Sequence, residues 1–530
     1  MAIIGFLGTA IFYTLRNDLS VSIVCMVNTT STEKVSKSAM CPGENKTTET
    51  DTTNTINGHL QWSKRVQGSI LSSFYLGYIG SQIPSGYLAG RFGGKIVIAS
   101  GALIGAILTL LSPSAANINA SLFIAVRILI GITQVLFFNY TYKIKLADEK
   151  IVYTHTIDEL FNWLRQGGLL PSFHTIWSRW SPPLETSLLT GINYAGAQIG
   201  NVVVMPISGL LCKYGFAGGW PSIYYILGCV ALLWLLIWLY YASDTPSTHK
   251  RISKVERSYI NESLQAIISS NEEKKPPVPW LTIIRSKAVW GVWCGHFSAD
   301  WGAYMMMTSL PLFMDDVLGF DITATGFIVA LPYIAYFFCI NIAGIIADNL
   351  RNRSILSTVA TRRLAMIIAL GSQAIFLVAS GYCKCGQQVL VIIFLTIGIG
   401  ISGVSYSGFL VNYLDIAPLY AGEIIAVGNT LSCLAGILCP LVAGWLTPSG
   451  SQKEWQTVFW VTAGVLLLGT LIFVILVEGE ILPWAKIAPH QSKSKFNELL
   501  SKSDSTDKTN ESTTNEKDST LSENIKYPSS

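Results

Sequence analysis

Two arginines stand in stretches of the sequence that are otherwise almost free of charge. Arg16 lies in the apolar stretch 2–27, and Arg127 follows the uncharged run 96–126. A charged side chain at bilayer depth costs at least about 2.5–3.5 kcal/mol, so it persists where it faces a cavity or a partner. The guanidinium group is a permanent cation whose fork of donors matches carboxylate and phosphate. We therefore expect both arginines to bind one anion. The alternative is an ion pair that only holds helices together, formed by Arg16 with Asp18 or by Arg127 with an acid, although positions 16 and 18 are about 200° apart on a helix and do not face each other.

A carboxylate and a histidine are candidates for carrying a coupling cation. Asp300 interrupts the uncharged run 288–314. An acidic side chain there can bind sodium or a proton, or neutralise an arginine across a cavity; a buried ion pair without further role is the alternative. His174 either relays a proton or hydrogen-bonds a loop, whereas we expect His296 to be a packed histidine. We therefore predict Asp300 and His174 as coupling residues.

Further polar side chains within apolar runs are expected to line the same cavity. Tyr78 and Gln82 are spaced i, i+4, which places them on one face of a helix. The other predicted lining residues are Asn193, Tyr194, Gln198 and Asn429. The sequence contains no recognisable nucleophile–base set, glycine-rich phosphate loop or metal-ligand spacing. We therefore expect no enzymatic activity, no catalytic residue, no metal site and no cofactor other than a coupling ion, Na⁺ or H⁺.

The chain is rich in apolar residues and poor in charge. Of its 530 residues, 50% are hydrophobic and 13% are charged, and the mean hydropathy is +0.45. A soluble globule cannot hide that much apolar surface, whereas a bilayer accepts it on the outside of the protein. The net charge of +4 provides no concentrated basic face, so no nucleic-acid partner is expected. These features predict an integral membrane protein surrounded by the lipid bilayer.

Apolar stretches long enough to cross a bilayer, about 20 residues each, recur along the chain. We predict twelve transmembrane helices, at 2–27, 66–88, 96–112, 120–138, 187–211, 221–242, 289–313, 322–347, 364–382, 388–412, 422–446 and 456–477. The predicted fold is therefore an all-α membrane protein made of two six-helix halves.

The polar connections set the domain organisation. The predicted parts are an N-terminal half at 1–242 with an extracytosolic loop at 28–62, a cytosolic central loop at 243–288, a C-terminal half at 289–478 and a disordered cytosolic tail at 479–530. Lys and Arg gather after the even-numbered helices, so both termini are expected in the cytosol. The outward-facing loop carries glycosylation sequons at Asn28 and Asn45. The membrane is either the plasma membrane or a lysosomal or vesicular one, and we expect a monomer.

The two halves carry a similar motif after their second helix. Residues 86–95 begin with Gly86 and contain Arg91, and residues 344–353 contain the matching set Gly344, Asp348 and Arg351. Small residues allow close helix contact, and the cations can pair with helix ends or with acids of the facing bundle. Ordinary cytosolic loop charge is the alternative. The repeated placement favours a gating motif in a transporter built from parallel repeats.

Several segments resemble the solute carrier 17 family of anion–cation symporters, which includes sialin, the vesicular glutamate transporters and the type I sodium–phosphate cotransporters. The segments are 13–24, 77–86, 174–185 (HTIWSRWSPPLE), 194–198, 205–209 and 412–418. The resemblance extends over about residues 3–480 and is strongest to insect-type inorganic phosphate cotransporters. It implies the major facilitator fold and raises the expectation that Arg16 and Arg127 contact the anion.

The chain departs from this family at identifiable positions. Proton-coupled members have a glutamate seven residues after the helix-4 arginine, where this chain has Gln134, and vesicular glutamate carriers have an arginine where it has Ala299. Because Gln134 cannot titrate, we expect weaker dependence on a proton gradient and stronger dependence on sodium or voltage. Residues 135–166 have no counterpart, and removing them restores the family pattern. We interpret this segment as a retained intron or wrongly joined exon, with a functional insertion as the alternative.

The resemblance implies symport of a small organic anion or inorganic phosphate with Na⁺ or H⁺ by alternating access. One alternative is a receptor or scaffold that has a transporter fold and does not transport. Another is an isoform inactivated by the segment 135–166. Hydropathy alone also fits a sugar carrier, but two intramembrane arginines favour an anion over a neutral sugar.

Overall fold

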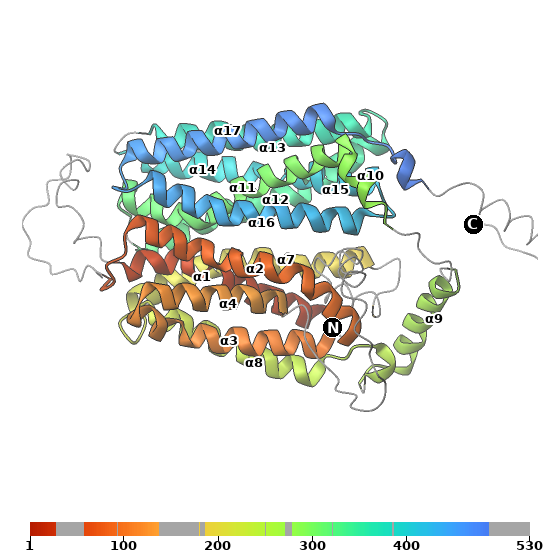
Figure 1. Ribbon diagram of the computed structural model, residues 1–530, viewed down its shortest axis with the longest axis horizontal. Helices are drawn as coiled ribbons and strands as arrows, with labels where there is room; N and C mark the ends of the chain where they lie inside the picture. The colour runs from red at the N-terminus through yellow and green to blue at the C-terminus, as the bar shows by residue number, and fades with distance from the viewer. Residues whose placement is uncertain are drawn as a thin grey trace, which may run out of the picture. The chain divides into compact units, whose positions relative to one another are not determined.

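The structure is a computed structural model. It describes residues 1–27, 58–92, 94–136, 180, 186–249, 251–270, 278–320, 322–383 and 386–486. The six long helices of the first half are α1 (Ala2–Met26), α2 (Lys64–Phe92), α3 (Gly94–Ile118), α4 (Ala120–Leu136), α7 (Thr186–Tyr214) and α8 (Pro221–Tyr241). The second half contains α11 (Lys287–Phe313), α12 (Ile322–Asn352), α13 (Thr358–Gly381), α14 (Gln388–Ser402), α15 (Val411–Ile416), α16 (Ala421–Leu446) and α17 (Gln452–Leu476), as Figure 1 shows.

Two interruptions and several short helices complete these elements. The π-helical turn η3 (Met314–Leu318) ends α11, and a second one, η4 (Tyr406–Leu410), precedes α15, so that α14, η4 and α15 make up a single crossing. The connection between the halves holds η2 (Pro246–Thr248), α9 (Lys254–Ser270) and α10 (Trp280–Arg285). A compact unit runs from Met1 to Ile481, and the turn η5 (Pro483–Ala485) lies beyond it.

Eight of the described helices are long and apolar enough to cross a membrane. The other long helices of the two halves are α1, α2, α4 and α11. These four helices carry Arg16, Tyr78, Arg127 and Asp300. Polar and charged residues in a membrane helix normally face the protein interior, so we expect these side chains to lie inside the bundle.

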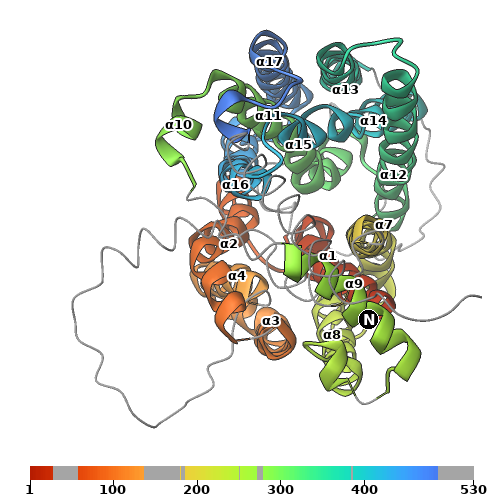
Figure 2. The ribbon, with the colours of Figure 1, turned by 90° about the vertical axis from the view of Figure 1, so that its right-hand side faces the viewer.

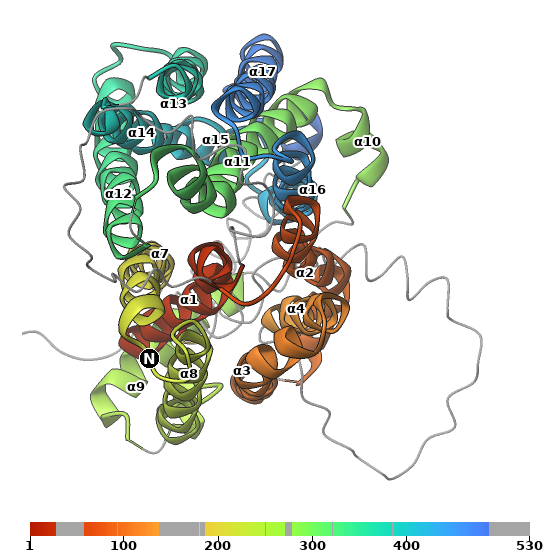
Figure 3. The same ribbon diagram turned by 90° about the vertical axis from the view of Figure 1, so that its left-hand side faces the viewer.

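Helices of each half pack mainly against one another. In the first half the main contacts are between α1 and α7, α2 and α4, α3 and α4, and α3 and α8; in the second they join α11 to α16 and α17, and α13 to α14 and α17. Contacts between the halves are made chiefly by α2 with α16 and by α7 with α12 (Figures 2 and 3). Gly68 on α2 and Gly444 on α16 permit this approach, because a Cβ on either would overlap the backbone of the opposing helix.

The described helices agree with the predicted ones apart from their ends, and two differences have physical reasons. Helix α13 begins at Thr358 instead of 364, because Arg362, which precedes the predicted helix, is buried inside α13 and paired with Asp415. The predicted helix 388–412 is interrupted by η4 and continues to Ile416. The predicted loop 28–62 and tail 479–530 lie largely outside the described residues, as does most of the segment 135–166.

Candidate functional site

The guanidinium group of Arg16 lies among aromatic rings at mid-helix in α1. Its Cζ atom is 4.9 Å from the ring centre of Tyr75, 5.3 Å from Tyr304 and 5.5 Å from Tyr78. The rings of Tyr13 and Phe74 lie at similar distances. Three helices, α1, α2 and α11, supply this aromatic cage. Cation–π attraction holds the guanidinium in place without neutralising its charge.

Arg16 retains hydrogen-bonding capacity and charge. Its Nε is buried without a hydrogen-bond partner, and the described residues place no carboxylate within salt-bridge distance of it. Tyr75 and Tyr304 contact each other edge to face at 5.1 Å, so the cage closes between α2 of the first half and α11 of the second. A fixed, unneutralised cation between the two halves suits an anionic ligand with carboxylate or phosphate oxygens.

Arg127 is paired with an acid. Its Nη1 donates to Asp18 Oδ1 at 3.1 Å, and the two side chains are 1% and 0% exposed. Its Nη2 donates to the Arg16 carbonyl oxygen at 3.3 Å. The expected convergence of both arginine forks on one anion is therefore not seen in this conformation. Arg127 connects α4 to the segment of α1 that carries Arg16. The observed contact is the alternative considered from the sequence, in which an arginine pairs with an acid.

Asp300 belongs to a second polar cluster, in the C-terminal half. Its Oδ2 lies 3.4 Å from His296 Nε2 and accepts a hydrogen bond from the Ser432 hydroxyl. His296 Nδ1 is 3.0 Å from the Tyr413 hydroxyl. From the sequence we expected His296 to be a packed histidine. Its side chain is buried, and its ring also faces the carboxylate of Asp300, the predicted coupling residue. The cluster joins α11, α15 and α16.

The arginine cage and the acidic cluster are close neighbours. The phenol of Tyr304 interacts electrostatically with both Arg16 and Asp300, and so does the thiol of Cys433 on α16. Asp300 keeps a 17% exposed side chain, whereas His296 is 4% exposed. A cation from one half and a carboxylate from the other therefore share the same central region.

One ion pair connects the halves at the end of the bundle where α1 and α7 terminate. Lys64 Nζ, at the start of α2, lies 2.5 Å from Asp316 Oδ1 in η3. Trp455 Nε1 on α17 donates to the other carboxylate oxygen at 3.1 Å. Among the described residues this is the salt bridge that joins the first half to the second. It connects α2 of the first half to η3 of the second at that end.

The predicted gating residues of the second half lie at the opposite end. Arg351 Nη2 is 3.8 Å from Asp415 Oδ1, and buried Arg362 binds the same carboxylate, its Nε 2.7 Å from Oδ2. Asp348 is exposed, and Gly344 faces open space. The structure thus pairs Arg351 with an acid of its own half.

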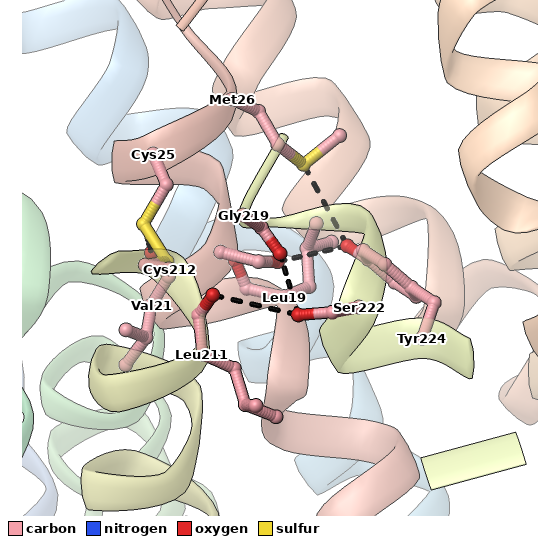
Figure 4. Close-up of a disulfide and its surroundings, with 10 residues drawn as sticks. Leu19, Val21, Cys25, Met26, Leu211, Cys212, Gly219, Ser222 and Tyr224 are labelled. Carbon is pink, nitrogen blue, oxygen red and sulfur yellow. Dashed lines mark hydrogen bonds between the residues drawn. A yellow bond between two sulfur atoms is a disulfide. The ribbon is translucent and has the colours of Figure 1, made fainter. Parts of the chain in front are cut away.

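A disulfide joins Cys25, at the end of α1, to Cys212, near the end of α7 (Figure 4). Beside it the Ser222 hydroxyl donates to the Gly219 carbonyl oxygen at 2.6 Å, and the Tyr224 hydroxyl donates to Met26 Sδ at 3.6 Å. The two partners are 187 residues apart, so local spacing could not reveal the pair.

The remaining predicted residues are only partly placed. The ring of Tyr78 contributes to the cage around Arg16. Gln198 on α7 is half-buried, and Asn429 lies one turn before Ser432 on α16, nearer to the acidic cluster. The side chains of Gln82, Gly86, Arg91, Asn193 and Tyr194 lie outside the described residues, as do His174, Asn28 and Asn45.

The sequence analysis named the charged residues Arg16 and Asp300, and it missed the side chains that surround them. Tyr75 and Tyr304 complete the cage, and Ser432 and Tyr413 complete the acidic cluster. Tyr304 had a local signal, because it lies four residues after Asp300 and so on the same face of the helix. The others come from helices distant in sequence.

The chain is similar to known transporters over most of its length. The pattern of the Major Facilitator Superfamily matches residues 45–144 and 164–440, leaving 145–163 between the matched parts. An uncharacterized transporter of Caenorhabditis elegans, slc-17.2, is 47% identical over 93% of this chain and 93% of its own length. Human sialin is 37% identical over 92% of this chain and 90% of its own. Human vesicular glutamate transporter 2 is 32% identical over 92% and 75%.

Solved transporter structures share the arrangement of helices. A bacterial homologue of the human lysosomal transporter Spinster, in an inward-facing and occupied conformation, matches with a TM-score of 0.61 at 13% identity, covering 90% of this chain and 96% of that one. A D-xylose–proton symporter matches with a TM-score of 0.59 at 14% identity, covering 90% and 97%. At such identities the likeness concerns the fold, which agrees with the two-halved arrangement described above.

Proposed function

We propose that this chain, a multi-pass membrane protein that belongs to the solute carrier 17 family of the major facilitator superfamily, is a secondary active transporter. Its substrate is a small organic anion or inorganic phosphate, moved together with Na⁺ or H⁺. Relatives named sialin and vesicular glutamate transporter support transport of small anions within the family.

The caged guanidinium group of Arg16 is the observation that carries this proposal. It is a permanent cation at mid-helix, held by aromatic rings from both halves and not neutralised by a described carboxylate. A cation in that position is costly unless a ligand or cavity compensates for it. Carboxylate or phosphate oxygens would supply that compensation through charge-assisted hydrogen bonds.

Alternating access would follow from movement of one half against the other. The pair of Lys64 and Asp316 closes the end at which α1 and α7 terminate, so opening that end requires the pair to separate. The aromatic contact between Tyr75 and Tyr304 also spans the halves, directly beside Arg16. Binding of an anion at Arg16 would therefore act on contacts between the two halves, which have to rearrange during transport.

The disulfide supports the proposed orientation. Disulfides persist in oxidising compartments and are rare in the cytosol. The ends of α1 and α7 that carry Cys25 and Cys212 would therefore face the outside or an organelle lumen, and the termini the cytosol. The membrane is the plasma membrane or a lysosomal or vesicular membrane, and the transporter acts as a monomer.

Uptake into proteoliposomes tests the proposal. The full chain, Arg16→Gln and Arg16→Lys are reconstituted, with Arg285→Gln as a control that removes an exposed arginine from α10. Labelled inorganic phosphate, L-glutamate, monocarboxylates and acidic sugars serve as substrates. We expect saturable uptake of at least one anion by the full chain and the control, and none by Arg16→Gln. Saturable binding without uptake by the full chain would indicate a receptor instead.

A further inference from the structure

The acidic cluster in the C-terminal half has the composition of a proton-binding site. We infer that His296 and Asp300 together bind the coupling ion as a proton, and that this proton raises the affinity for the anion at Arg16. The inference rests on the proposed transport function and deepens it by naming the ion and its site.

The geometry sets a defined path for one proton. His296 Nε2 faces Asp300 Oδ2 at 3.4 Å, and His296 Nδ1 faces the Tyr413 hydroxyl at 3.0 Å. In the unloaded state the Tyr413 hydroxyl donates to Nδ1, and Nε2–H points at the carboxylate. An incoming proton adds to Nδ1, and the Tyr413 hydroxyl turns to accept from it. The net charge of the pair changes from −1 to 0.

Neighbouring helices fix the positions of the His296 imidazole and the Asp300 carboxylate. The Ser432 hydroxyl on α16 donates to Asp300 Oδ2, and the Phe409 ring stacks on the His296 imidazole with centroids 4.6 Å apart. A Cβ at Gly428 would overlap both the Tyr413 hydroxyl and His296 Nδ1, so the α16 backbone packs directly against them. Tyr413, Ser432 and Phe409 are positioning residues for the pair.

The other titratable groups around the pair are ordinarily neutral. Those acting electrostatically on Asp300 are Tyr304 on α11, Tyr336 on α12, Tyr406 in η4, Tyr413 on α15, and Cys433 and Cys439 on α16. Phenols and thiols ordinarily keep their protons at neutral pH. From the first half, α1 contributes the permanent cation Arg16. Within the described cluster, His296 and Asp300 are the pair that sets a ring nitrogen against a carboxylate oxygen, and both groups can accept a proton.

A sodium ion fits the same cluster less well. Hard cations such as sodium are bound by several oxygen ligands, whereas an imidazole nitrogen suits softer metal ions. The Oδ2 atom of Asp300 already faces His296 and accepts from Ser432. Sodium would have to displace the imidazole and turn the hydroxyl away. The existing donors and acceptors instead form a chain that a proton can join without displacing any side chain.

The charge of the pair is positioned to act on anion binding. Tyr304 belongs to the cage around Arg16 and lies one helical turn after Asp300 on α11, so the two charged groups lie near the same side chain. The negative charge of ionised Asp300 weakens the attraction between this region and an anion. A proton bound to the His296–Asp300 pair brings the net charge of the pair to zero and removes this effect. Coupling between two sites typically changes affinity about 5- to 150-fold, and we expect a change in this range.

This site also explains how proton coupling can survive without an acid at position 134. The Gln134 amide is buried and donates to the Phe12 carbonyl oxygen at 3.0 Å, which is a structural contact between α4 and α1. The proton site would then lie in the C-terminal half, on α11. Proton dependence, expected to be weak from Gln134 alone, would be retained through the pair.

The test uses sodium-free proteoliposomes of the full chain with labelled phosphate or L-glutamate, whichever is taken up. Two readouts are compared: exchange at equal pH on both sides between about pH 5.5 and 8, and accumulation driven by a pH gradient. The variants are Asp300→Asn and His296→Gln, and the control is Glu256→Gln, which neutralises an exposed carboxylate on α9.

We expect the apparent affinity in exchange to fall about 5- to 150-fold with rising pH in the full chain and the control, and to become independent of pH in both variants. Accumulation driven by the pH gradient should be lost in both. Accumulation that persists in Asp300→Asn, or that only a sodium gradient drives in the full chain, would overturn the inference and leave transport intact. Loss of exchange at every pH in both variants would also overturn it, because the pair would then be required for binding itself. Failure of the full chain to exchange any anion would instead refute the proposed function.

Discussion

The buried pair of Arg127 and Asp18 gives a sharp prediction for the first half. The charged atoms lie 3.1 Å apart, and both side chains are almost completely buried. Removing one partner of such a pair leaves an uncompensated charge, which costs about 3–5 kcal/mol. At about 1.4 kcal/mol for each factor of ten, the folded population falls relative to the unfolded by roughly 10²–10⁴. Arg127→Gln and Asp18→Asn should each lose thermal stability and surface delivery.

The double variant separates charge compensation from other roles. Replacing both residues by Gln and Asn removes both charges and keeps similar shapes, so stability should recover to within about 1–2 kcal/mol of the original protein. Thermal melting of the detergent-solubilised protein and surface labelling of cells measure this recovery, with Glu256→Gln as the exposed control. Single variants as stable as the original protein, or a double variant no better than the worse single one, would refute the reasoning.

Uptake by the double variant addresses the second role of Arg127. Its Nη2 donates to the Arg16 carbonyl oxygen, and the sequence places it among the predicted anion ligands. We therefore expect the double variant to reach the membrane and to transport poorly per molecule. Uptake at the original rate would remove Arg127 from the binding site and leave Arg16 as its cation.

Three further predictions concern other parts of the chain. Deleting residues 135–166 should improve surface delivery and anion uptake, since the family pattern leaves 145–163 unmatched; equal transport by the long form, or loss of activity on deletion, would identify a functional loop. Asp316→Asn removes the partner of Lys64 and should weaken closure by about 1–3 kcal/mol, measured as faster labelling of engineered cysteines by impermeant reagents; an unchanged labelling rate would argue against a gate. Without reductant, mass spectrometry should find Cys25 and Cys212 unalkylated in denatured protein, and both alkylated after reduction.

Local patterns in the sequence predicted the fold, and they singled out Arg16, Arg127 and Asp300 as candidate site residues. Apolar length sufficed to place the helices, because a bilayer imposes a minimum span on each one. The spacing of Arg16 and Asp18, about 200° apart on a helix, indicated that they do not face each other. The structure agrees: Asp18 pairs with Arg127, while Arg16 lies among aromatic rings.

Local sequence patterns could not predict contacts between segments that are distant in sequence. Asp18 and Arg127 are 109 residues apart, and Cys25 and Cys212 are 187 apart. Arg362 precedes the predicted helix 364–382, among the basic residues expected in a cytosolic loop, whereas the structure buries it in α13, where an arginine is costly. That cost is offset by Asp415, 53 residues further on, which only the folded helices bring near.

Concentrative uptake tests the central claim of anion–cation symport most directly. Proteoliposomes of the full chain are loaded with a known internal anion concentration, and labelled anion is supplied outside under an imposed proton or sodium gradient with the voltage clamped. We predict that one ion gradient drives the internal anion above its external concentration, that an ionophore for that ion abolishes the accumulation, and that Arg16→Gln shows none. Uptake that never exceeds equilibrium under either gradient, or accumulation that persists in Arg16→Gln, would contradict symport through this site.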